Sequence, residues 1–428
     1  MASGLNLPGT IRPGRAHFAA LQHTPVMPLA PLTVLTTLLH VYIGLRLLPA
    51  LAAATAAWPV LACALVVSAV AMPLPFVARA SRVRALGPVL RWVGLLGMGW
   101  FSSLFLLTLV RDVALLGGWI GTLAGAAIDL ARWQQASAVA VPVVATLVTA
   151  AGFVNARRTA RVKRVQVPIA GLPSQLAGFT IAQLSDIHVG PTIRRRYLQR
   201  IVDTVNRLRA DMVAITGDLV DGPVADLREH VAPLAGLRAK HGVFVVTGNH
   251  EYYVGAHAWI DELRRLGLHV LLNEHVVLQT RNIQGAQTDE EVLESAIVVA
   301  GVTDYTAGLF DASHASDPKR ALENAPPLVH TRLLLAHQPR SAPAAAEAGF
   351  HLQISGHTHG GQFFPWNLFV PLQQPFTAGL HRLQAMWVYV SRGTGYWGPP
   401  KRFGAPSEIT LLTLVPTSAL LESDGAAA

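Results

Sequence analysis

Residues 178–188 read GFTIAQLSDIH, and this stretch decides how the second half of the chain is interpreted. Its first part is rich in apolar and β-branched residues and predicts a strand, which Asp186 and His188 follow directly. Residues 194–209 then show the pattern of a basic amphipathic helix, and the apolar run 212–216 predicts another strand. The order strand, helix, strand predicts a βαβ unit, whose parallel strands end at the same edge of a sheet.

The same alternation continues toward the C-terminus. A helix is expected near 226–238 and a third strand at 243–247. Residues 281–295 and 311–327 contain charges and turn formers without periodicity, so they are expected to be surface loops. Five further β-type runs indicate a second sheet, and they lie at 296–300, 332–336, 351–354, 387–390 and 408–412. We therefore expect residues 165–428 to form an α/β domain.

The first 164 residues have a different character. Hydrophobic residues make up 51% of the chain and charged residues only 14%, and long uncharged stretches before residue 157 account for this. A buried helical core would need polar faces at helical spacing, and residues 92–110 show none. Four stretches lack Asp, Glu, Lys and Arg and have about the length that crosses a bilayer of ~30 Å: 27–45, 58–78, 92–110 and 138–156.

The basic residues that flank these four predicted spans indicate an orientation, because Lys and Arg stay preferentially in the cytoplasm. Arg46, Arg111 and Arg132 lie on one side. The other side receives Arg12, Arg15, Arg79, Arg82, Arg84, Arg91, Arg157, Arg158, Arg161, Lys163 and Arg164. We therefore expect a multi-pass protein of the cell (inner) membrane with its C-terminal domain in the cytoplasm.

Two features of the membrane region have more than one interpretation. The apolar run 113–128 is interpreted as an interfacial or re-entrant segment, whereas a fifth span would reverse the orientation of the C-terminal domain. His40 lies within the first span. A histidine packed between helices is favoured over a proton or ligand site.

Charge and cysteine content restrict the partners. The net charge is +9, and much of the excess is arginine beside apolar segments, which favours an anionic lipid surface over nucleic acid. Residues 165–428 lack the run of basic residues interleaved with aromatics that a nucleic-acid ligand would need, and no obligate protein partner is inferred. Cys63 is the only cysteine, so His, Asp and Asn must hold any metal ion.

Metal-ligand side chains follow five of the predicted strands. One such residue after one strand would be weak evidence, but the recurrence points to a metal centre at one sheet edge. Glycine precedes several of them, at Gly217, Gly248 and Gly356, where it lets the backbone turn sharply. The candidate residues are Asp186, His188, Asp218, Asn249, His250, His337, His357 and His359. Two ions ~3.5–4 Å apart would suit the hydrolysis of a phosphate ester, with one carboxylate shared between them.

The series Asp186-Ile187-His188, Gly217-Asp218, Gly248-Asn249-His250-Glu251, His337 and Gly356-His357-Thr358-His359 resembles the calcineurin-like metallophosphoesterases. The resemblance covers roughly residues 176–415 and implies a four-layer αββα sandwich. A bacterial membrane-associated branch of that family is similar in further positions: Tyr252, Tyr253, Gly360, Gly361, Gln362 and 391–400.

The resemblance also implies roles for the residues. Glu251 would orient His250, which would stabilise the transition state or protonate the leaving oxygen, and Asp218 would bridge the two ions. Arg392 is a further candidate for contacting a substrate phosphate. One ion would be held by Asp186, His188 and His359, and the other by Asn249, His337 and His357. Mn²⁺ is the first expectation, with Fe or Zn²⁺ as alternatives.

A membrane anchor beside such a site favours a lipid phosphodiester or pyrophosphate as substrate, because tethering raises the effective concentration of membrane substrates. The motif is similar to that of UDP-2,3-diacylglucosamine hydrolases of lipid A synthesis. The alternatives are a broad phosphodiesterase with soluble substrates and a membrane sensor that binds a ligand without turnover. Trp366, Trp387 and Trp397 are interpreted as packing residues, with a lipid-accepting rim as the alternative.

Overall fold

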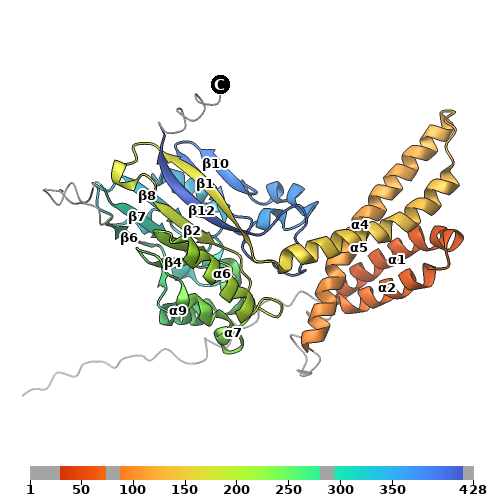
Figure 1. The fold of residues 1–428 in the computed structure, drawn as a ribbon, viewed down its shortest axis with the longest axis horizontal. Helices are drawn as coiled ribbons and strands as arrows, with labels where there is room; N and C mark the ends of the chain where they lie inside the picture. The colour runs from red at the N-terminus through yellow and green to blue at the C-terminus, as the bar shows by residue number, and fades with distance from the viewer. Residues whose placement is uncertain (1–28, 74–86, 280–292, 294, 418–428) are drawn as a thin grey trace, which may run out of the picture.

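The structure is a computed structural model that describes residues 29–73, 87–279, 293 and 295–417. A bundle of helices lies at one end and an α/β domain at the other (Figure 1). Several expectations fall outside the described residues. They are most of the loop 281–295, the ends of the spans 27–45 and 58–78, and the basic residues Arg12, Arg15, Arg79, Arg82 and Arg84.

The helical region contains α1 (Leu29–Ala54), α2 (Trp58–Ala71), α4 (Gly87–Leu123) and α5 (Leu130–Arg157). Among the described residues, three helices are long and apolar enough to cross a membrane, namely α1, α4 and α5. Three of the four predicted spans thus match candidate membrane helices, and the fourth, at 58–78, stays a prediction because residues 74–78 lie outside the described residues. The 14 residues of α2 rise only ~21 Å, which is less than a bilayer core of ~30 Å.

The segment 113–128 is not a separate fifth helix, and its interpretation as an interfacial or re-entrant segment stays a prediction. Its first part continues α4, which runs unbroken for 37 residues, or ~55 Å, to Leu123. The rest forms the turn into α5, with Gly125 in the left-handed region at φ +89°. The helix continues because apolar side chains persist through Gly117 and Gly118 and no proline interrupts them.

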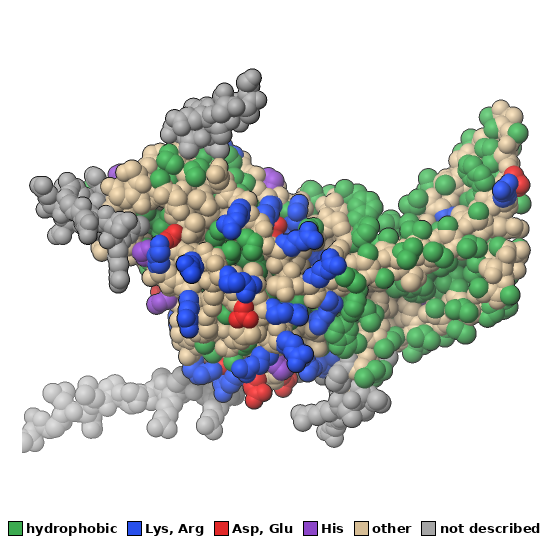
Figure 2. Space-filling model, viewed as in Figure 1, with side chains coloured by type: hydrophobic (Ala, Val, Ile, Leu, Met, Phe, Trp, Pro, Cys, Tyr) green, Lys and Arg blue, Asp and Glu red, His purple; other side chains and the backbone are tan. Residues whose placement is uncertain are grey.

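The four helices bury little of their apolar surface. Leu45, Val60 and Val113 are each more than 70% exposed, and apolar side chains cover this region on the face shown in Figure 2. His40 lies between helices, as expected: its Nδ1 is 2.7 Å from Thr36 O and its Nε2 is 3.0 Å from Ser68 Oγ. A helix that exposes apolar residues on nearly all sides is suited to lipid rather than water.

The α/β domain contains two six-stranded sheets, and in each the order is given from edge to edge. The first sheet is β1 (Arg161–Ile169), β12 (Glu408–Pro416), β2 (Thr180–Leu184), β3 (Met212–Thr216), β4 (Val243–Val246) and β5 (His269–Val270). The second is β10 (Gly379–Leu383), β11 (Met386–Val390), β9 (Leu352–Ser355), β8 (Thr331–Leu335), β7 (Ile297–Gly301) and β6 (Glu274–Leu278).

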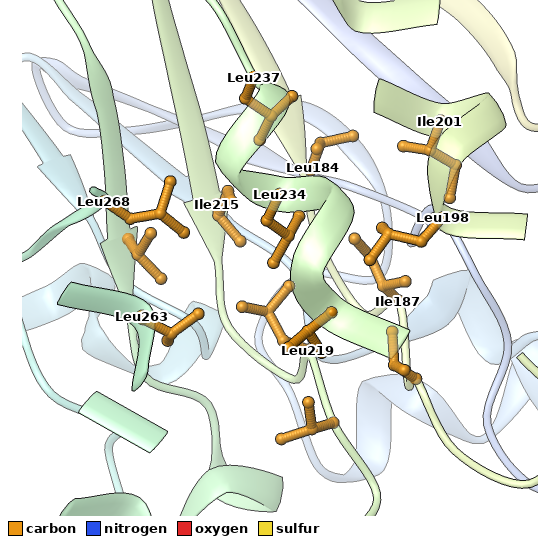
Figure 3. Packing of buried hydrophobic residues seen from close by; sticks show 14 of the residues in the cluster. Leu184, Ile187, Leu198, Ile201, Ile215, Leu219, Leu234, Leu237, Leu263 and Leu268 are labelled. Atoms are coloured by element: carbon orange, nitrogen blue, oxygen red, sulfur yellow. The ribbon is translucent and has the colours of Figure 1, made fainter. Parts of the chain in front are cut away.

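Three layers of apolar side chains hold the sheets and helices together. Residues such as Ile181, Phe244 and Leu333 fill the space between the two sheets. The outer face of the first sheet packs against α6 (Arg195–Leu208), α7 (Val224–Val231) and α9 (Ala256–Arg265), and Leu198 and Leu263 belong to this layer (Figure 3). The outer face of the second sheet is covered by α11 (Ala342–Glu347). This is the expected four-layer αββα sandwich.

The predicted helices and strands differ from the observed ones mainly at their ends. The helix expected at 226–238 is α7 followed by a 3-10 helix at Ala232–Gly236, and the loop at 311–327 contains short 3-10 helices. The first sheet begins with β1 at Arg161, before the expected domain boundary at residue 165. Only residues 158–160 separate α5 from β1.

Candidate metal centre

The candidate ligands meet at one edge of the two sheets, just beyond the ends of five parallel strands. Asp186 and His188 follow β2, Asp218 follows β3, and His337 follows β8. Asn249 begins the short helix α8 (Asn249–Val254) directly after β4. His357 and His359 follow β9. The structure thus brings together every metal ligand proposed from the sequence.

The backbone at this edge is unusually strained. Five of the ligands lie in the left-handed region that L-residues avoid, and this conformation costs roughly 1–2 kcal/mol for each. Strain of this kind persists where a site needs it. The five residues are Asp186 at φ +53°, His188 at +54°, Asp218 at +51°, His357 at +70° and His359 at +51°.

Three of the neighbouring glycines are required for close approach. A Cβ atom at Gly356 would lie 2.2 Å from Oδ2 of Asp186, and one at Gly248 would lie 2.2 Å from Oδ1 of Asp218. Gly217 has φ +84°, and a Cβ there would lie 2.8 Å from Nδ1 of His337. Any side chain at these positions would displace a ligand.

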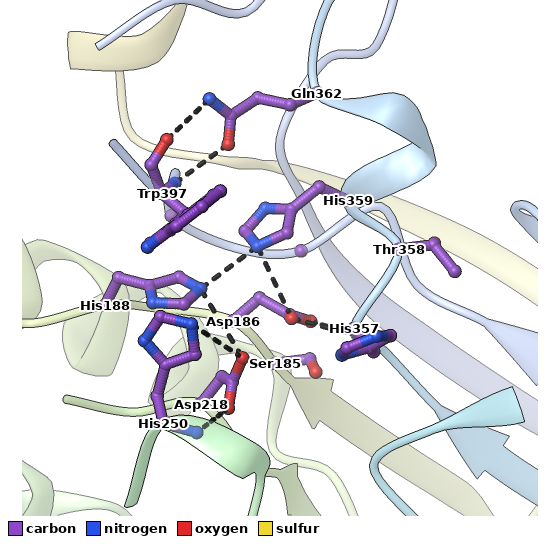
Figure 4. A network of polar contacts seen from close by, with 12 residues as sticks. Ser185, Asp186, His188, Asp218, His250, His357, Thr358, His359, Gln362 and Trp397 are labelled. Atoms are coloured by element: carbon purple, nitrogen blue, oxygen red, sulfur yellow. Dashed lines mark hydrogen bonds and ion pairs between the residues drawn. The ribbon is translucent and has the colours of Figure 1, made fainter. Parts of the chain in front are cut away.

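We call the residues proposed to hold one ion a half-site. The first half-site contains Asp186, His188 and His359. The Nε2 atoms of His188 and His359 lie 3.0 Å apart, and Oδ1 of Asp186 is 3.5 Å from Nε2 of His359 (Figure 4). Behind the ligands, Nδ1 of His188 contacts Oδ1 of Asp221 at 2.9 Å. Burial, with Arg402 and His188 nearby, holds the pKa of His359 well below its usual range. The ring is therefore neutral and able to bind a cation.

The second half-site, proposed to hold the other ion, consists of Asn249, His337 and His357, and the two histidines share a possible metal position with Asp218. Nε2 of His337 lies 3.2 Å from Nδ1 of His357, and Nδ1 of His337 is 2.7 Å from the carbonyl oxygen of Thr216. Burial, reinforced by His337, lowers the pKa of His357 to about 3. Oδ1 of Asn249 is buried and has no hydrogen-bond partner among the described residues. A buried amide oxygen without a donor is well suited to a metal ion.

Asp218 lies between the two half-sites. Its Oδ2 is 3.3 Å from Nε2 of His337 and 3.8 Å from Nε2 of His188. Burial alone would raise its pKa, but the imidazoles of His337 and His250 lower it well below the usual range. Asp218 is therefore an ionised carboxylate that faces both groups. Carboxylate, imidazole and amide donors without sulfur fit two divalent cations of the Mn²⁺, Fe or Zn²⁺ class.

His250 is held by a residue that the sequence analysis missed. Its Nδ1 is 2.7 Å from Oδ1 of Asp221, the carboxylate that also contacts His188. Burial lowers the pKa of His250, but Asp218 and Asp221 outweigh it and raise the value to about 9. The sequence signal for Asp221 was its place three residues after Asp218, in the loop that follows the same strand.

Glu251 has a different part from the expected one of orienting His250. Its carboxylate accepts hydrogen bonds from the backbone N–H groups of Gly248, Asp218 and Leu219, at 2.7–3.0 Å. Burial followed by the charge of Asp218 raises its pKa to about 7. Glu251 therefore ties the loop after β3 to the N-terminus of α8. The correction arises because the side chain of Glu251 turns back to its own helix cap.

Some of the positions predicted to resemble the membrane-associated branch lie near His359 and His250. Gln362 is bonded to Trp397 through both its amide atoms, at 2.7 and 2.8 Å (Figure 4). The ring of Trp397 is 5.8 Å from that of His250. Arg392 packs beside Gly360, where a Cβ would lie 2.8 Å from its Cγ. Its proposed contact with a substrate phosphate stays a prediction.

Known proteins are similar to the part of the chain that carries this centre. The sequence profile described as calcineurin-like phosphoesterase matches residues 179–361. A "transmembrane protein with metallophosphoesterase domain" of Bos taurus is 41% identical over 276 residues, which cover 63% of this chain and 61% of the relative. The protein of the same name in Danio rerio is 38% identical over 281 residues, covering 64% and 62%.

A shorter relative is matched over most of its length. An "uncharacterized metallophosphoesterase" of Aquifex aeolicus is 32% identical over 236 residues, which cover 55% of this chain and 84% of that protein. By contrast, the chain spans only 61% and 62% of the Bos taurus and Danio rerio relatives.

Proposed function

Because this chain belongs to the calcineurin-like metallophosphoesterase family, we propose that it is a membrane-anchored hydrolase of phosphodiesters or pyrophosphates that uses two divalent metal ions. The observation that carries the proposal is the convergence of the strained ligands with the unpaired oxygen of Asn249. When bound, the ions neutralise charge on the phosphoryl oxygens and lower the pKa of a water nucleophile.

Side chains of the protein itself donate the proton and limit the access of water. His250 stands beside the half-sites, with its Nε2 3.9 Å from Oδ2 of Asp218. Asp221 holds Nδ1 of this ring and favours the protonated imidazole, so Nε2 is the atom that donates a proton to the leaving oxygen. The ring of Trp397, held by Gln362, lies against His250 and limits the approach of water on that side.

An apolar surface beside the metal centre supports a lipid substrate. It consists of five side chains on the turns that follow the loop of His357 and His359. They are between 50% and 81% exposed: Phe364, Trp366, Leu368, Phe369 and Leu372. Nε1 of Trp366 donates to Ser102 Oγ of α4 at 3.2 Å. The surface therefore runs from the metal centre to a membrane helix. Exposed apolar surface of this kind is typical of a lipid or membrane contact.

The three tryptophans considered in the sequence differ in their surroundings. Trp397 is about half exposed next to His250, and Trp366 is about half exposed next to α4, which supports a lipid-accepting rim. Trp387 lies in β11, where its Nε1 donates to the carbonyl oxygen of Pro168 at 2.6 Å, and it is a packing residue. Acyl chains against the apolar surface would leave the phosphate group facing the ions.

The substrate class can be tested with protein solubilised in detergent and supplied with Mn²⁺. We expect a higher kcat/KM for a lipid pyrophosphate such as UDP-2,3-diacylglucosamine than for a soluble bis-aryl phosphate. Phe369→Glu should raise KM for the lipid more than for the soluble compound. Activity on the soluble compound alone would favour the broad phosphodiesterase, and no hydrolysis of either would contradict the whole proposal.

The orientation remains a proposal with a direct test. The start of α4 and the end of α5 lie beside the catalytic domain, so the turn between these helices is at the far end of the bundle (Figure 1). In a Cys63→Ser background, Ala126→Cys should react with a membrane-impermeant maleimide in intact cells. Ala225→Cys, on the exposed face of α7, should react only after lysis. The reverse pattern would place the catalytic domain outside the cytoplasm.

A further inference from the structure

The segment 393–402 lies between the metal centre and the membrane helices and contacts both. At one end, the N–H of Thr394 donates to Ser185 O at 2.7 Å, and the N–H of Gly395 donates to Asp186 O at 3.1 Å. A Cβ at Gly395 would lie 2.1 Å from the carbonyl oxygen of Ile187. The segment therefore lies directly against the loop that carries the first half-site.

Arg402 contacts the half-site from behind. Its side chain is fully buried, and Nη2 lies 2.9 Å from Nδ1 of His359 while Nη1 donates to the carbonyl oxygen of the same residue at 2.9 Å. Nη1 also donates to Arg392 O at 2.7 Å, and Nε donates to Gly395 O at 3.0 Å. One rigid guanidinium thus fixes the backbone of the loops that carry this candidate metal ligand.

The backbone at Arg402 is held in turn by a membrane helix. The N–H of Arg402 donates to Gly152 O of α5 at 2.9 Å, and Nδ2 of Asn155 donates to Arg402 O at 3.3 Å. The contact needs a glycine on the helix. A Cβ at Gly152 would lie 2.7 Å from Cγ of Lys401.

Lys401 extends to the other long helix. Its side chain is buried, and Nζ donates to Gly99 O of α4 at 2.8 Å and to Ser103 Oγ. Nζ also lies 4.8 Å from the ring centre of Phe363. Burying a lysine among carbonyl and hydroxyl oxygens is costly unless they stay in place. The helices α4 and α5 therefore satisfy the polar groups of two consecutive residues, one of which holds His359.

We propose that Arg402 is a positioning residue for His359, and that α4 and α5 hold it in place, so the first half-site reaches its full geometry only with the membrane helices docked. This inference rests on the proposed function, because it assumes that His359 binds a metal ion. The catalytic domain is then one unit with its anchor, and a disturbance of the helices reaches the metal centre through Lys401 and Arg402.

The test compares Gly152→Leu with Ala151→Leu in the full chain in lipid nanodiscs. Position 151 is exposed on the same helix, so it serves as the matched control. Two measurements are made: the visible spectrum of the cobalt(II)-loaded protein, and kcat and KM with a soluble bis-aryl phosphate. We expect Gly152→Leu to change the cobalt bands and to lower kcat by about 10- to 100-fold with little change in KM, as for loss of a group supporting a metal ligand.

Further variants make the result decisive. Arg402→Met should change the cobalt spectrum in the same way as Gly152→Leu. If Gly152→Leu fails to fold, as judged by circular dichroism, Lys401→Met replaces it, because it removes the bonds to α4 at similar volume. Wild-type spectra in both Arg402→Met and the helix variant would overturn the inference, as would equal effects of Gly152→Leu and Ala151→Leu. If the wild type hydrolyses nothing, the proposed function fails and the cobalt spectrum alone decides the inference.

Discussion

The rings of His337 and His359 face the same centre, but different groups hold them from behind. His337 is bonded to the carbonyl oxygen of Thr216, the last residue of β3. His359 contacts the guanidinium of Arg402, and its neighbour His188 contacts the carboxylate of Asp221. The second half-site is therefore supported by the main chain of a sheet, and the first by charged side chains.

This difference indicates which half-site can change its geometry more easily. A carbonyl at the end of a buried strand moves only if the sheet moves, because packed interiors deform little. Arg402 and Asp221 lie in loops, so their positions depend on what the loops contact. We expect substitutions outside the ligand set to affect the first half-site more than the second.

The largest effect is expected for His250→Ala, which separates ion binding from turnover. Loss of a positioned general acid should lower kcat by ~10²–10⁴-fold. Both half-sites should keep their ions, as measured by mass spectrometry of the bound metal. His330→Ala is the control, because His330 is exposed at the opposite end of β8 from His337. Cellular function that survives His250→Ala would favour the ligand-binding sensor over the enzyme.

Metal addition should stabilise the protein through both half-sites. Each ion at a concentration 100 times its Kd adds about 2.7 kcal/mol to the free energy of unfolding, since it binds only the folded state. Asn249→Ala should abolish the stabilisation by the ion in the second half-site and leave the stabilisation by the ion in the first half-site unchanged. Melting temperatures with Mn²⁺ and with a chelator measure this difference. Equal values for the wild type under the two conditions would contradict the metal centre.

Asp221→Asn should weaken the first half-site selectively. Removing a carboxylate that supports a metal-binding histidine lowers metal affinity or activity by about 10- to 100-fold. The loss should appear as one weakened ion in a calorimetric titration with Mn²⁺, while the other binds as before. Asp226→Asn, an exposed carboxylate in the first turn of α7, is the matched change. Equal weakening of both ions would show that the half-sites are not supported separately.

The smallest effect is a pH dependence at the contact between the catalytic domain and α4. Burial lowers the pKa of Lys401 to about 8, from 10.5 in the unfolded chain. The unfolded state therefore binds more protons in this window, and stability rises with pH, by about 1.4 kcal/mol between pH 7 and pH 9. Melting curves in detergent should show this rise in the wild type and a flatter profile in Lys401→Met. Parallel profiles would mean that Lys401 stays charged.

The strands that the sequence predicts and those it misses differ by their place in the sheets. The eight predicted strands are the inner ones, such as β3, where every residue is buried and all but Thr216 are apolar. The four missed strands are the edges of the two sheets, β1, β5, β6 and β10. Their sequences mix charge with apolar residues, as in Arg161–Ile169, because one side of an edge strand faces solvent.

The residues at the metal centre also differ in whether the sequence predicts them. The candidate ligands can be predicted from the sequence because each follows an apolar strand and belongs to a known motif. Arg402 and Lys401 carry no such signal, since a basic pair in a loop usually faces water. Their burial comes from contacts with Gly99 and Gly152, which lie some 300 and 250 residues away in the chain. Such pairings depend on tertiary packing, which no local pattern records.

The three residues between α5 and β1 also bear on how the protein would meet the proposed lipid substrate. A fully extended link of this length reaches only ~10 Å, and β1 is paired with β12 along its whole length. The catalytic domain therefore cannot sweep a wide area around its anchor as a domain on a flexible tether would. For the proposed lipid substrate, the rate of encounter would then be set by diffusion of the whole molecule in the plane of the membrane.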